Sequence, residues 1–274
     1  MSWLHFPLRM VAQIFASTWL LNVWGWVGHA LRLIWTCHWC GPFFLAIIFC
    51  IMLIMILEHA VMTLQTAIIR ETFPVGPLQC NCTIIGDPIT KKAIVVDPGG
   101  NPELIMAKLE ALGLQVVSII HTHAHLDHFL ASGQMKEKTG ATLHLHKDDQ
   151  FLWDNLEMQC GMFGVPYVPV PPPDQWLSDD QALDCGCGVA LHTPGHTPGS
   201  MSFWFPQTKL LIAGDTLFRG GIGRTDLWGG DYPTIERSIK QRLYTLDEDA
   251  TVVTGHGPDT RLGDEMRSNP YVRA

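Results

Sequence analysis

The segment from His121 to His128 constrains this chain more than any other part of its sequence. It reads His-Thr-His-Ala-His-Leu-Asp-His, so four imidazoles and one carboxylate fall within eight residues. These are the side chains that bind zinc, iron or manganese in proteins. The apolar stretch 116–120 comes just before the segment and has the composition of a buried strand. A strand that leads into crowded metal ligands indicates a metal centre at the edge of a sheet.

The spacing inside this segment favours two metal ions over one. In extended backbone His123 and His125 point to the same side, because side chains alternate along a strand. Asp127 and His128 follow at a point where the chain can turn into a helix-like stretch that ends at residues 139–140. One short loop can therefore give two ligands to one ion and two to a neighbouring ion.

Three later segments repeat the order of an apolar strand followed by a loop with a metal-binding side chain. His196 lies in a Pro/Gly-rich turn, Asp215 ends the apolar run Leu-Leu-Ile-Ala-Gly, and His256 follows Val-Val-Thr-Gly. In open α/β sheets, sites form where the strands end, and a rigid scaffold holds their ligands in place. We therefore expect these three side chains to join the 123–128 cluster.

These motifs, taken in order, resemble those of the metallo-β-lactamase superfamily. The resemblance is carried by H-x-H-x-D-H at 123–128, followed by His196, Asp215 and His256. The surrounding motifs are similar to those of the glyoxalase II-like hydrolases, and most of all to their compact single-domain bacterial branch. These motifs are T-P-G-H-T-P-G-S, G-D-T-L-F, I-G-R-T-D and G-H-G-P. The match runs from about residue 64 to residue 271, and five motifs in one order are very specific.

The resemblance implies a fold, a reaction and a ligand set. The fold would be an α/β, four-layer αβ/βα sandwich. The reaction would be hydrolysis of a thioester, with S-lactoylglutathione as the type substrate. The nucleophile would be a hydroxide that bridges two divalent ions. These ions would be zinc, with iron or manganese as alternatives. Asp127 and Asp215 would be catalytic as well as metal-binding. His123, His125 and His196 would bind the first ion, Asp127, His128 and His256 the second, and Asp215 would bridge both.

The chain departs from the two-domain glyoxalase II enzymes in the part that binds glutathione. Those enzymes append a helical domain after the last histidine, whereas only 18 residues follow His256 here. Arg224, in Gly-Arg-Thr-Asp, is the candidate for binding a substrate carboxylate. An ion pair with Asp226 or Asp231 is the alternative interpretation of this arginine.

Two other activities of the same superfamily remain open as alternatives. A persulfide dioxygenase, which uses one iron ion and oxygen, also resembles the chain through Gly-Arg-Thr-Asp. A nuclease is disfavoured by charge, because residues 62–274 carry 16 Lys and Arg against 25 Asp and Glu, a net charge of −9. A nucleic-acid partner needs basic residues to neutralise its phosphates. We therefore expect no nucleic-acid partner, and the resemblance to the hydrolases implies a small-molecule thioester, which can be linked to glutathione.

Several further polar residues are interpreted as supports of the site. We expect a structural role for His121, and a surface or supporting role for His144 and His146. His192 precedes the Pro/Gly turn and is expected to brace it, since partners of the ligand imidazoles orient them. Asp97, at the end of an apolar strand, is expected to brace a ligand loop.

The first 61 residues differ in composition from the rest of the chain. They hold six of the ten Trp and only three charged residues, and residues 33–57 are uncharged throughout. About twenty apolar residues span a bilayer core, so 33–57 is a candidate membrane anchor. The alternative is an over-extended start, because relatives begin near residue 62. The chain is thus divided into an apolar extension, 1–61, and a hydrolase domain, 62–274.

The cysteines of residues 62–274 are odd in number, at 80, 82, 160, 185 and 187. An odd number suits a reducing compartment better than a disulfide framework, so we expect a cytoplasmic protein, or a membrane-anchored one if 33–57 inserts.

Local patterns predict the secondary structure of the domain. Asn101 is a plausible helix cap, with Pro102 at the first helical position and Ile105, Leu109 and Leu112 on one face. Residues 165–174, with five prolines, are expected to be a stiff loop, either at the substrate entrance or as a rim connection. Strands are predicted near 64–70, 80–86, 93–97, 142–146, 189–193, 201–205 and 209–214, up to residue 120 and before residue 255, with helices near 101–113, 148–157 and 233–246.

Overall fold

The computed structural model describes residues 50, 51, 53, 54 and 68–274. The chain divides into two compact units, Met1–Val61 and Met62–Ala274. The candidate anchor at 33–57 lies almost wholly outside the described residues. Within the described ranges, no helix combines the length and the apolar character needed to cross a membrane.

The first half of the domain is built on a six-stranded sheet with the strand order β1-β2-β3-β4-β5-β6. The β1–β2–β3 part is antiparallel, and β3 to β6 run parallel. Its strands are β1 (Ile69–Val75), β2 (Cys80–Gly86), β3 (Lys92–Val96), β4 (Gln115–Ile120), β5 (Thr142–His146) and β6 (Gln175–Leu177).

The second half is built on another six-stranded sheet, with the order β14-β13-β10-β9-β8-β7. Of its neighbouring pairs, only β10 and β13 run parallel. Its strands are β7 (Gln181–Ala182), β8 (Val189–His192), β9 (Met201–Phe205), β10 (Leu210–Gly214), β13 (Thr251–Thr254) and β14 (Thr260–Arg261), and β11 (Leu217–Phe218) pairs separately with β12 (Gly221–Ile222).

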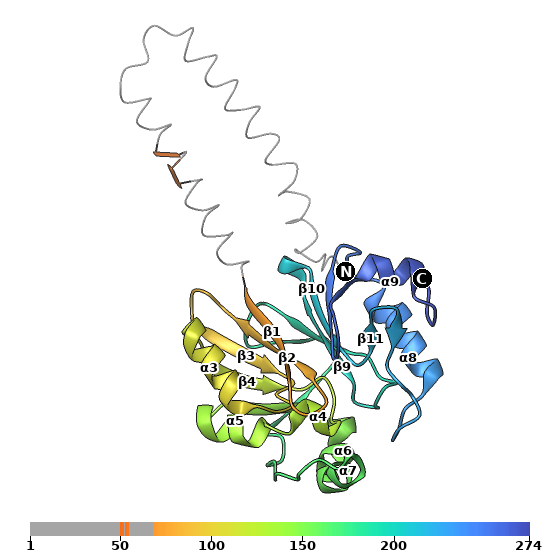
Figure 1. The fold of residues 1–274 in the computed structure, drawn as a ribbon. Helices are drawn as coiled ribbons and strands as arrows, with labels where there is room; N and C mark the ends of the chain where they lie inside the picture. The colour runs from red at the N-terminus through yellow and green to blue at the C-terminus, as the bar shows by residue number, and fades with distance from the viewer. Residues whose placement is uncertain (1–49, 52, 55–67) are drawn as a thin grey trace, which may run out of the picture. The chain divides into compact units, whose positions relative to one another are not determined.

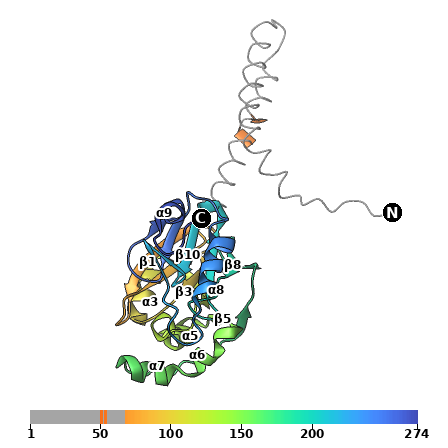
Figure 2. The same ribbon diagram turned by 90° about the vertical axis from the view of Figure 1, so that its right-hand side faces the viewer.

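Helices cover the outer faces of both sheets. In Figure 1, α3 and α5 lie against the first sheet, and α8 and α9 lie against the second. Figure 2 shows α6 and α7 at the end of the domain opposite β10. The helices are α3 (Pro102–Leu112), α4 (Leu126–Phe129), α5 (Ser132–Thr139), α6 (Gln150–Asp154), α7 (Leu156–Phe163), α8 (Tyr232–Ser238) and α9 (Leu262–Ser268), and a π-helix, Ile239–Leu243, continues α8.

Three apolar clusters separate the four layers. One joins the first sheet to its helices and includes Ile105 and Ile119. A second lies between the two sheets, where Ile94 of β3 and Phe203 of β9 are both fully buried. The third joins the second sheet to α8 and the π-helix and includes Ile235. The domain is therefore the α/β, four-layer αβ/βα sandwich that the sequence motifs implied.

Three local predictions were wrong, each for an identifiable reason. The first strand was predicted to end near residue 70, whereas β1 continues to Val75 and contains Pro74, which an edge strand tolerates. Residues 64–67 of that prediction lie outside the described residues. The helix predicted at 148–157 is two helices, α6 and α7, because the Asn155 side chain donates to the Phe151 carbonyl and its backbone leaves helical geometry. Asn101 makes no helix cap and instead accepts a hydrogen bond from the Gly76 amide.

Other predictions are confirmed. The helix-like stretch that ends at 139–140 is α4 followed by α5, and residues 165–174 form no helix or strand. Strands β2, β5 and β9 have the predicted bounds. Strands β4, β8, β10 and β13 end directly before the loops that carry the candidate ligands, so the topology gathers these loops at one edge of the sandwich (Figure 1).

Candidate metal centre

All seven candidate ligands come together at this edge, from both sheets. The first sheet supplies its ligands after β4, and the second sheet supplies one each after β8, β10 and β13. The Met201 amide donates a hydrogen bond of 2.7 Å to the Thr122 carbonyl and so connects the two halves beside the site. The Asn81 amide donates in the same way to the Gly255 carbonyl, at 2.7 Å.

Three imidazole nitrogens form a close triangle. His125 Nδ1 lies 3.0 Å from His123 Nε2 and 2.9 Å from His196 Nε2, and the last two atoms are 3.2 Å apart. A ring nitrogen can either donate or accept, so three of them cannot satisfy one another in a ring of hydrogen bonds. At least two of the three nitrogens must therefore both be donors or both be acceptors.

Neighbouring groups fix which nitrogens are free to bind a cation. His196 Nδ1 donates to the Arg224 carbonyl at 2.8 Å, which leaves its Nε2 as a lone pair. His123 Nδ1 lies 3.1 Å from the Thr122 hydroxyl, and this hydroxyl donates its own proton to Asp97 Oδ2 at 2.6 Å. His123 Nε2 and His196 Nε2 therefore carry electron pairs that point into the triangle, as the binding of a metal ion requires.

A second group of atoms lies next to the first. His256 Nε2 is 3.0 Å from Asp127 Oδ2, and His128 Nε2 is 3.8 Å from the same oxygen. His128 Nε2 is fully buried without a hydrogen-bond partner. A buried polar atom without a partner is costly, and coordination to a cation would remove this cost.

Asp215 lies between the two groups. Its Oδ2 is 3.6 Å from His196 Nε2 and 3.8 Å from His256 Nε2, while its Oδ1 is 3.5 Å from His128 Nε2. Oδ1 is buried and has no hydrogen-bond partner. The Asp215 carboxylate can occupy this place only because residue 255 is a glycine: a Cβ there would lie 1.9 Å from Asp215 Oδ1.

The electrostatics of the two groups differ. Burial lowers the pKa values of His123, His125 and His196, so these rings are neutral and available as ligands. Burial also opposes a charge on His128, but the nearby carboxylates, Asp127 among them, outweigh it and raise the pKa of His128. The first group is thus neutral and the second carries the carboxylate charge, which suits a cation at each place.

Asp97 braces the ligand loop, as the sequence predicted. Its Oδ1 accepts from the Thr122 amide at 2.7 Å, and its Oδ2 accepts from His128 Nδ1 at 3.0 Å. Cys80 Sγ also lies 3.4 Å from His128 Nδ1, and burial raises the pKa of this thiol to about 12, so it is neutral. Asp97 therefore fixes the orientation of the His128 ring.

Asp149 was missed by the sequence analysis, although it connects the two ligand loops. Its carboxylate accepts from the Ala124 amide at 3.0 Å, the Thr197 hydroxyl at 2.8 Å and the Gly199 amide at 2.6 Å. Burial raises its pKa to about 6 against the effect of these hydrogen bonds. Its position just after β5, at the same sheet edge as the ligands, was the available signal.

The structural roles of His121 and His192 are confirmed. His121 is fully buried between Ser132 Oγ and the His144 carbonyl, both at 2.7 Å, and burial lowers its pKa to about 4. His192 Nε2 donates to the Pro198 carbonyl at 2.9 Å and so braces the turn. His146 stacks on His192 with ring centroids 4.2 Å apart. The surface interpretation of His144 was wrong, because the first sheet buries this residue between its neighbouring strands.

Arg224 lies beside the centre with an exposed guanidinium. It makes two hydrogen bonds of 2.7 Å to Asp226, which is one of the alternatives that the sequence left open. Trp228, four residues later, was not identified from sequence, and its ring centroid lies 6.1 Å from that of His125. One segment thus places a cation and an aromatic ring at the rim of the site.

Comparisons with known proteins identify the family. The model of the Metallo-beta-lactamase superfamily matches residues 75–256. The chain belongs to the metallo-β-lactamase superfamily. Its curated relatives include the hydroxyacylglutathione hydrolase GloC of Haemophilus influenzae, 39% identical over 74% of this chain and 98% of the relative.

Solved structures of the superfamily agree with this assignment. The crystal structure of TTHA1623 in a di-iron-bound form is 34% identical, with a TM-score of 0.69 over 74% of this chain and 100% of that one. The BLEG-1 B3 metallo-β-lactamase is 33% identical, with a TM-score of 0.70 over 75% and 100%. Superfamily membership, the named hydrolase and the ligand groups support a metal-dependent hydrolase.

Proposed function

We propose that this protein is a binuclear metallohydrolase that cleaves thioesters, with S-lactoylglutathione or a related acyl-thiol as its substrate. One observation carries the proposal: two groups of ligand atoms, His123/His125/His196 and Asp127/His128/His256, lie side by side with Asp215 close to both. A single ion held by the three histidines of the first group would leave His128 Nε2 of the second group buried without a hydrogen-bond partner.

The donor set fits two divalent ions, zinc first and iron or manganese as alternatives. Imidazole and carboxylate bind all three metals, so the supply in the cell decides among them. The di-iron form of TTHA1623 supports a pair of ions in this relative. When bound, such ions polarise a carbonyl group and lower the pKa of water from about 15.7 to about 7.

The residues of the chain have separate tasks in the hydrolysis. Asp215, close to both ligand groups, would be a ligand to both ions. Asp127 contacts His256 through Oδ2, and its other oxygen is left to orient the attacking water toward the acyl carbon. Thr122 and Asp97 hold the imidazoles in the tautomers that face the ions. These groups are placed before substrate arrives, which reduces the reorganisation needed in the transition state.

A thioester suits this arrangement because a thiolate leaves without a strong acid to protonate it. Arg224 is proposed to bind a carboxylate of the thiol half by exchanging its partner Asp226 for the substrate. The glutathione hydrolase GloC supports this class of substrate. We propose the cytoplasm as the location, in keeping with the free cysteines of the described residues, and no nucleic-acid partner.

Metal analysis coupled to turnover tests the proposal. The purified protein should contain two divalent ions per chain and release thiol from S-lactoylglutathione. Asp215→Ala should lose both properties, whereas Asp247→Ala, an exposed carboxylate paired with Lys209, should keep them. One iron per chain with oxygen uptake on glutathione persulfide would instead show a persulfide dioxygenase.

A further inference from the structure

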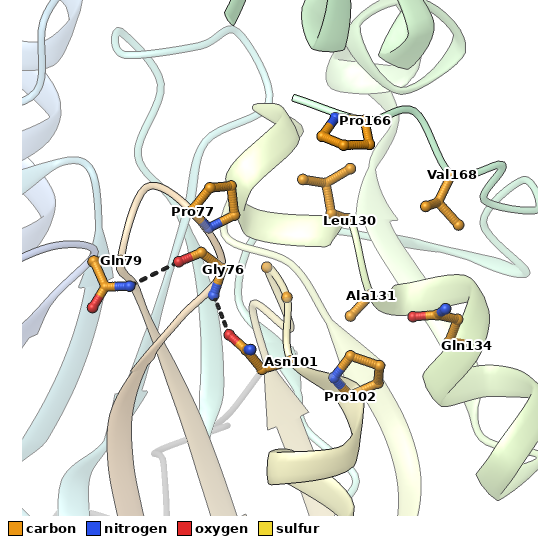
Figure 3. A pocket seen from close by; sticks show the side chains of 12 residues that line it. Gly76, Pro77, Gln79, Asn101, Pro102, Leu130, Ala131, Gln134, Pro166 and Val168 are labelled. Atoms are coloured by element: carbon orange, nitrogen blue, oxygen red, sulfur yellow. Dashed lines mark hydrogen bonds between the residues drawn. The ribbon is translucent and has the colours of Figure 1, made fainter. Parts of the chain in front are cut away.

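A cavity of about 460 Å³ is lined in part by residues that adjoin the loop with four of the candidate ligands. Four segments bound it: the β1–β2 turn at 76–79, the loop at 99–102, residues 130–134 and the proline-rich loop at 166–168. Figure 3 shows the turn residues on one side and Leu130 and Ala131 on the other, with Pro166 at the rim. Its volume is within the range of small-molecule sites.

Two walls of the cavity continue directly into the ligand loops. Leu130 comes two residues after His128 in the chain. Gly99 lies against the Asp127 backbone so closely that a Cβ there would be 1.5 Å from the Asp127 carbonyl oxygen. The cavity and the second ligand group therefore share the backbone of residues 127–131.

A third wall, also from the first sheet, lies next to a candidate ligand of the second half. Gln79 lines the cavity and precedes Cys80, which forms a backbone bridge with His256. The cavity is thus placed on the Asp127–His256 side of the centre. Arg224 is on the other side, because its carbonyl binds His196 of the first group.

The lining carries no charge. It consists of Gly, Pro, Ala, Val and Leu residues together with the amides of Gln79, Asn101 and Gln134. Two of these amides are already used within the wall, since Gln79 donates to the Gly76 carbonyl at 2.8 Å and Asn101 accepts from the Gly76 amide at 2.7 Å. Glutathione carries two carboxylates and an ammonium group, and such groups lose hydration in an uncharged cavity without gaining a partner.

We propose that this cavity binds the acyl group of the substrate, and that the protein prefers uncharged acyl chains longer than lactoyl. The inference rests on the proposed thioesterase function and assigns the thiol half to the Arg224 side. A volume of 460 Å³ equals that of about 15 water molecules in the liquid, at roughly 30 Å³ each. A lactoyl group has only about a third as many non-hydrogen atoms, so it leaves most of this space unfilled.

A series of S-acylglutathiones tests the inference at a constant thiol half. We expect kcat/KM to rise by tenfold or more from acetyl to hexanoyl, because each buried methylene contributes up to about a fourfold gain. Binding of the matching thioethers, in which a methylene separates the sulfur from the carbonyl, should strengthen in the same order by calorimetry. This second readout does not depend on turnover.

Matched variants locate the effect in the cavity. Gln134→Trp on α5 should fill the cavity and abolish the preference for hexanoyl, with acetyl turnover nearly unchanged. Glu137→Trp, exposed on the same helix and outside the lining, should behave as the wild type. Val168→Trp fills the cavity from the opposite loop and serves if Gln134→Trp does not fold.

The outcomes separate this inference from the function on which it rests. Hydrolysis of every thioester at similar rates, unchanged in Gln134→Trp and Val168→Trp, would overturn the acyl cavity and leave the thioesterase intact. Absence of hydrolysis for the whole series by protein that holds two metal ions would overturn both. A chain-length preference that both tryptophan variants remove would support the inference.

Discussion

Asp149→Asn offers the sharpest test of how the two ligand loops are held together. The carboxylate accepts three hydrogen bonds from residues of both loops. An asparagine of the same shape has one acceptor oxygen, which can serve Ala124 and Thr197, but its amide group then faces the buried Gly199 N–H. One unpaired buried donor costs about 1–3 kcal/mol of unfolding free energy.

The difference in unfolding free energy between wild type and variant should depend on pH, because the pKa of the native Asp149 carboxyl is shifted. Burial raises the pKa of Asp149 from 3.8 to about 6. The folded state therefore binds this proton more tightly than the unfolded state, so the contribution of Asp149 to stability is fully present below pH 3.8 and is lost as the pH rises through 6. At about 1.36 kcal/mol per pH unit, the wild type should lose about 2 kcal/mol between about pH 4 and about pH 7 through this group.

The variant lacks this titration, so the stability difference between wild type and Asp149→Asn should shrink by about 2 kcal/mol from about pH 4 to about pH 7. Urea unfolding of metal-free protein at both pH values measures it, and subtracting the two proteins removes titrations that they share. Asp148→Asn, with 58% of its side chain exposed, is the control and should show no such trend. An equal difference at both pH values would refute the proposed burial of charge at Asp149.

Three further predictions concern the surroundings of the centre. Asp97→Asn should weaken metal binding by about 10–100-fold in a chelator competition, since the His128 ring loses its carboxylate; unchanged affinity would contradict the bracing role. Gly99→Ala should lower both Tm and metal content, because its Cβ would meet the Asp127 carbonyl at 1.5 Å. Gly161→Ala, in α7 with open space around the added carbon, should instead stabilise by about 0.5–1 kcal/mol, and a loss of stability would count against this contrast. Trp228→Ala should raise KM for S-lactoylglutathione with little change in kcat, whereas Trp176→Ala on β6 should change neither; equal effects would exclude Trp228 from the substrate rim.

The sequence contained enough to predict that the seven side chains gather at one edge, whereas the four layers were implied by the resemblance to the superfamily, since periodicity alone indicates only an α/β domain. The reason is that each candidate ligand directly follows an apolar strand, and parallel neighbours such as β10 and β13 end at the same edge. The supporting role of Asp97 could be predicted on the same ground. Local signals were therefore sufficient wherever one strand end determined the position of one side chain.

The remainder depended on contacts between segments far apart in the chain. Asp149 lies in an acidic, helix-like stretch just after a predicted strand, and this position alone does not separate it from an exposed residue; its partners at 124, 197 and 199 show its role. Asn101 is placed in the sequence like a helix cap, yet its side chain accepts a hydrogen bond from Gly76, 25 positions earlier. Trp228 follows no strand, and its place near His125 is set by the folding of a glycine-rich loop.

The origin of the ligands in two different sheets has a consequence for the life of the protein. Four come from the first half and three from the second, so a bound ion would join the two halves in addition to the apolar packing between the sheets and the hydrogen bonds that already connect them, those of Asp149 among them. A cation at one hundred times its dissociation constant adds about 2.7 kcal/mol to folding. Without metal, the chain would thus open more often between its two halves and be cleaved more readily by proteases.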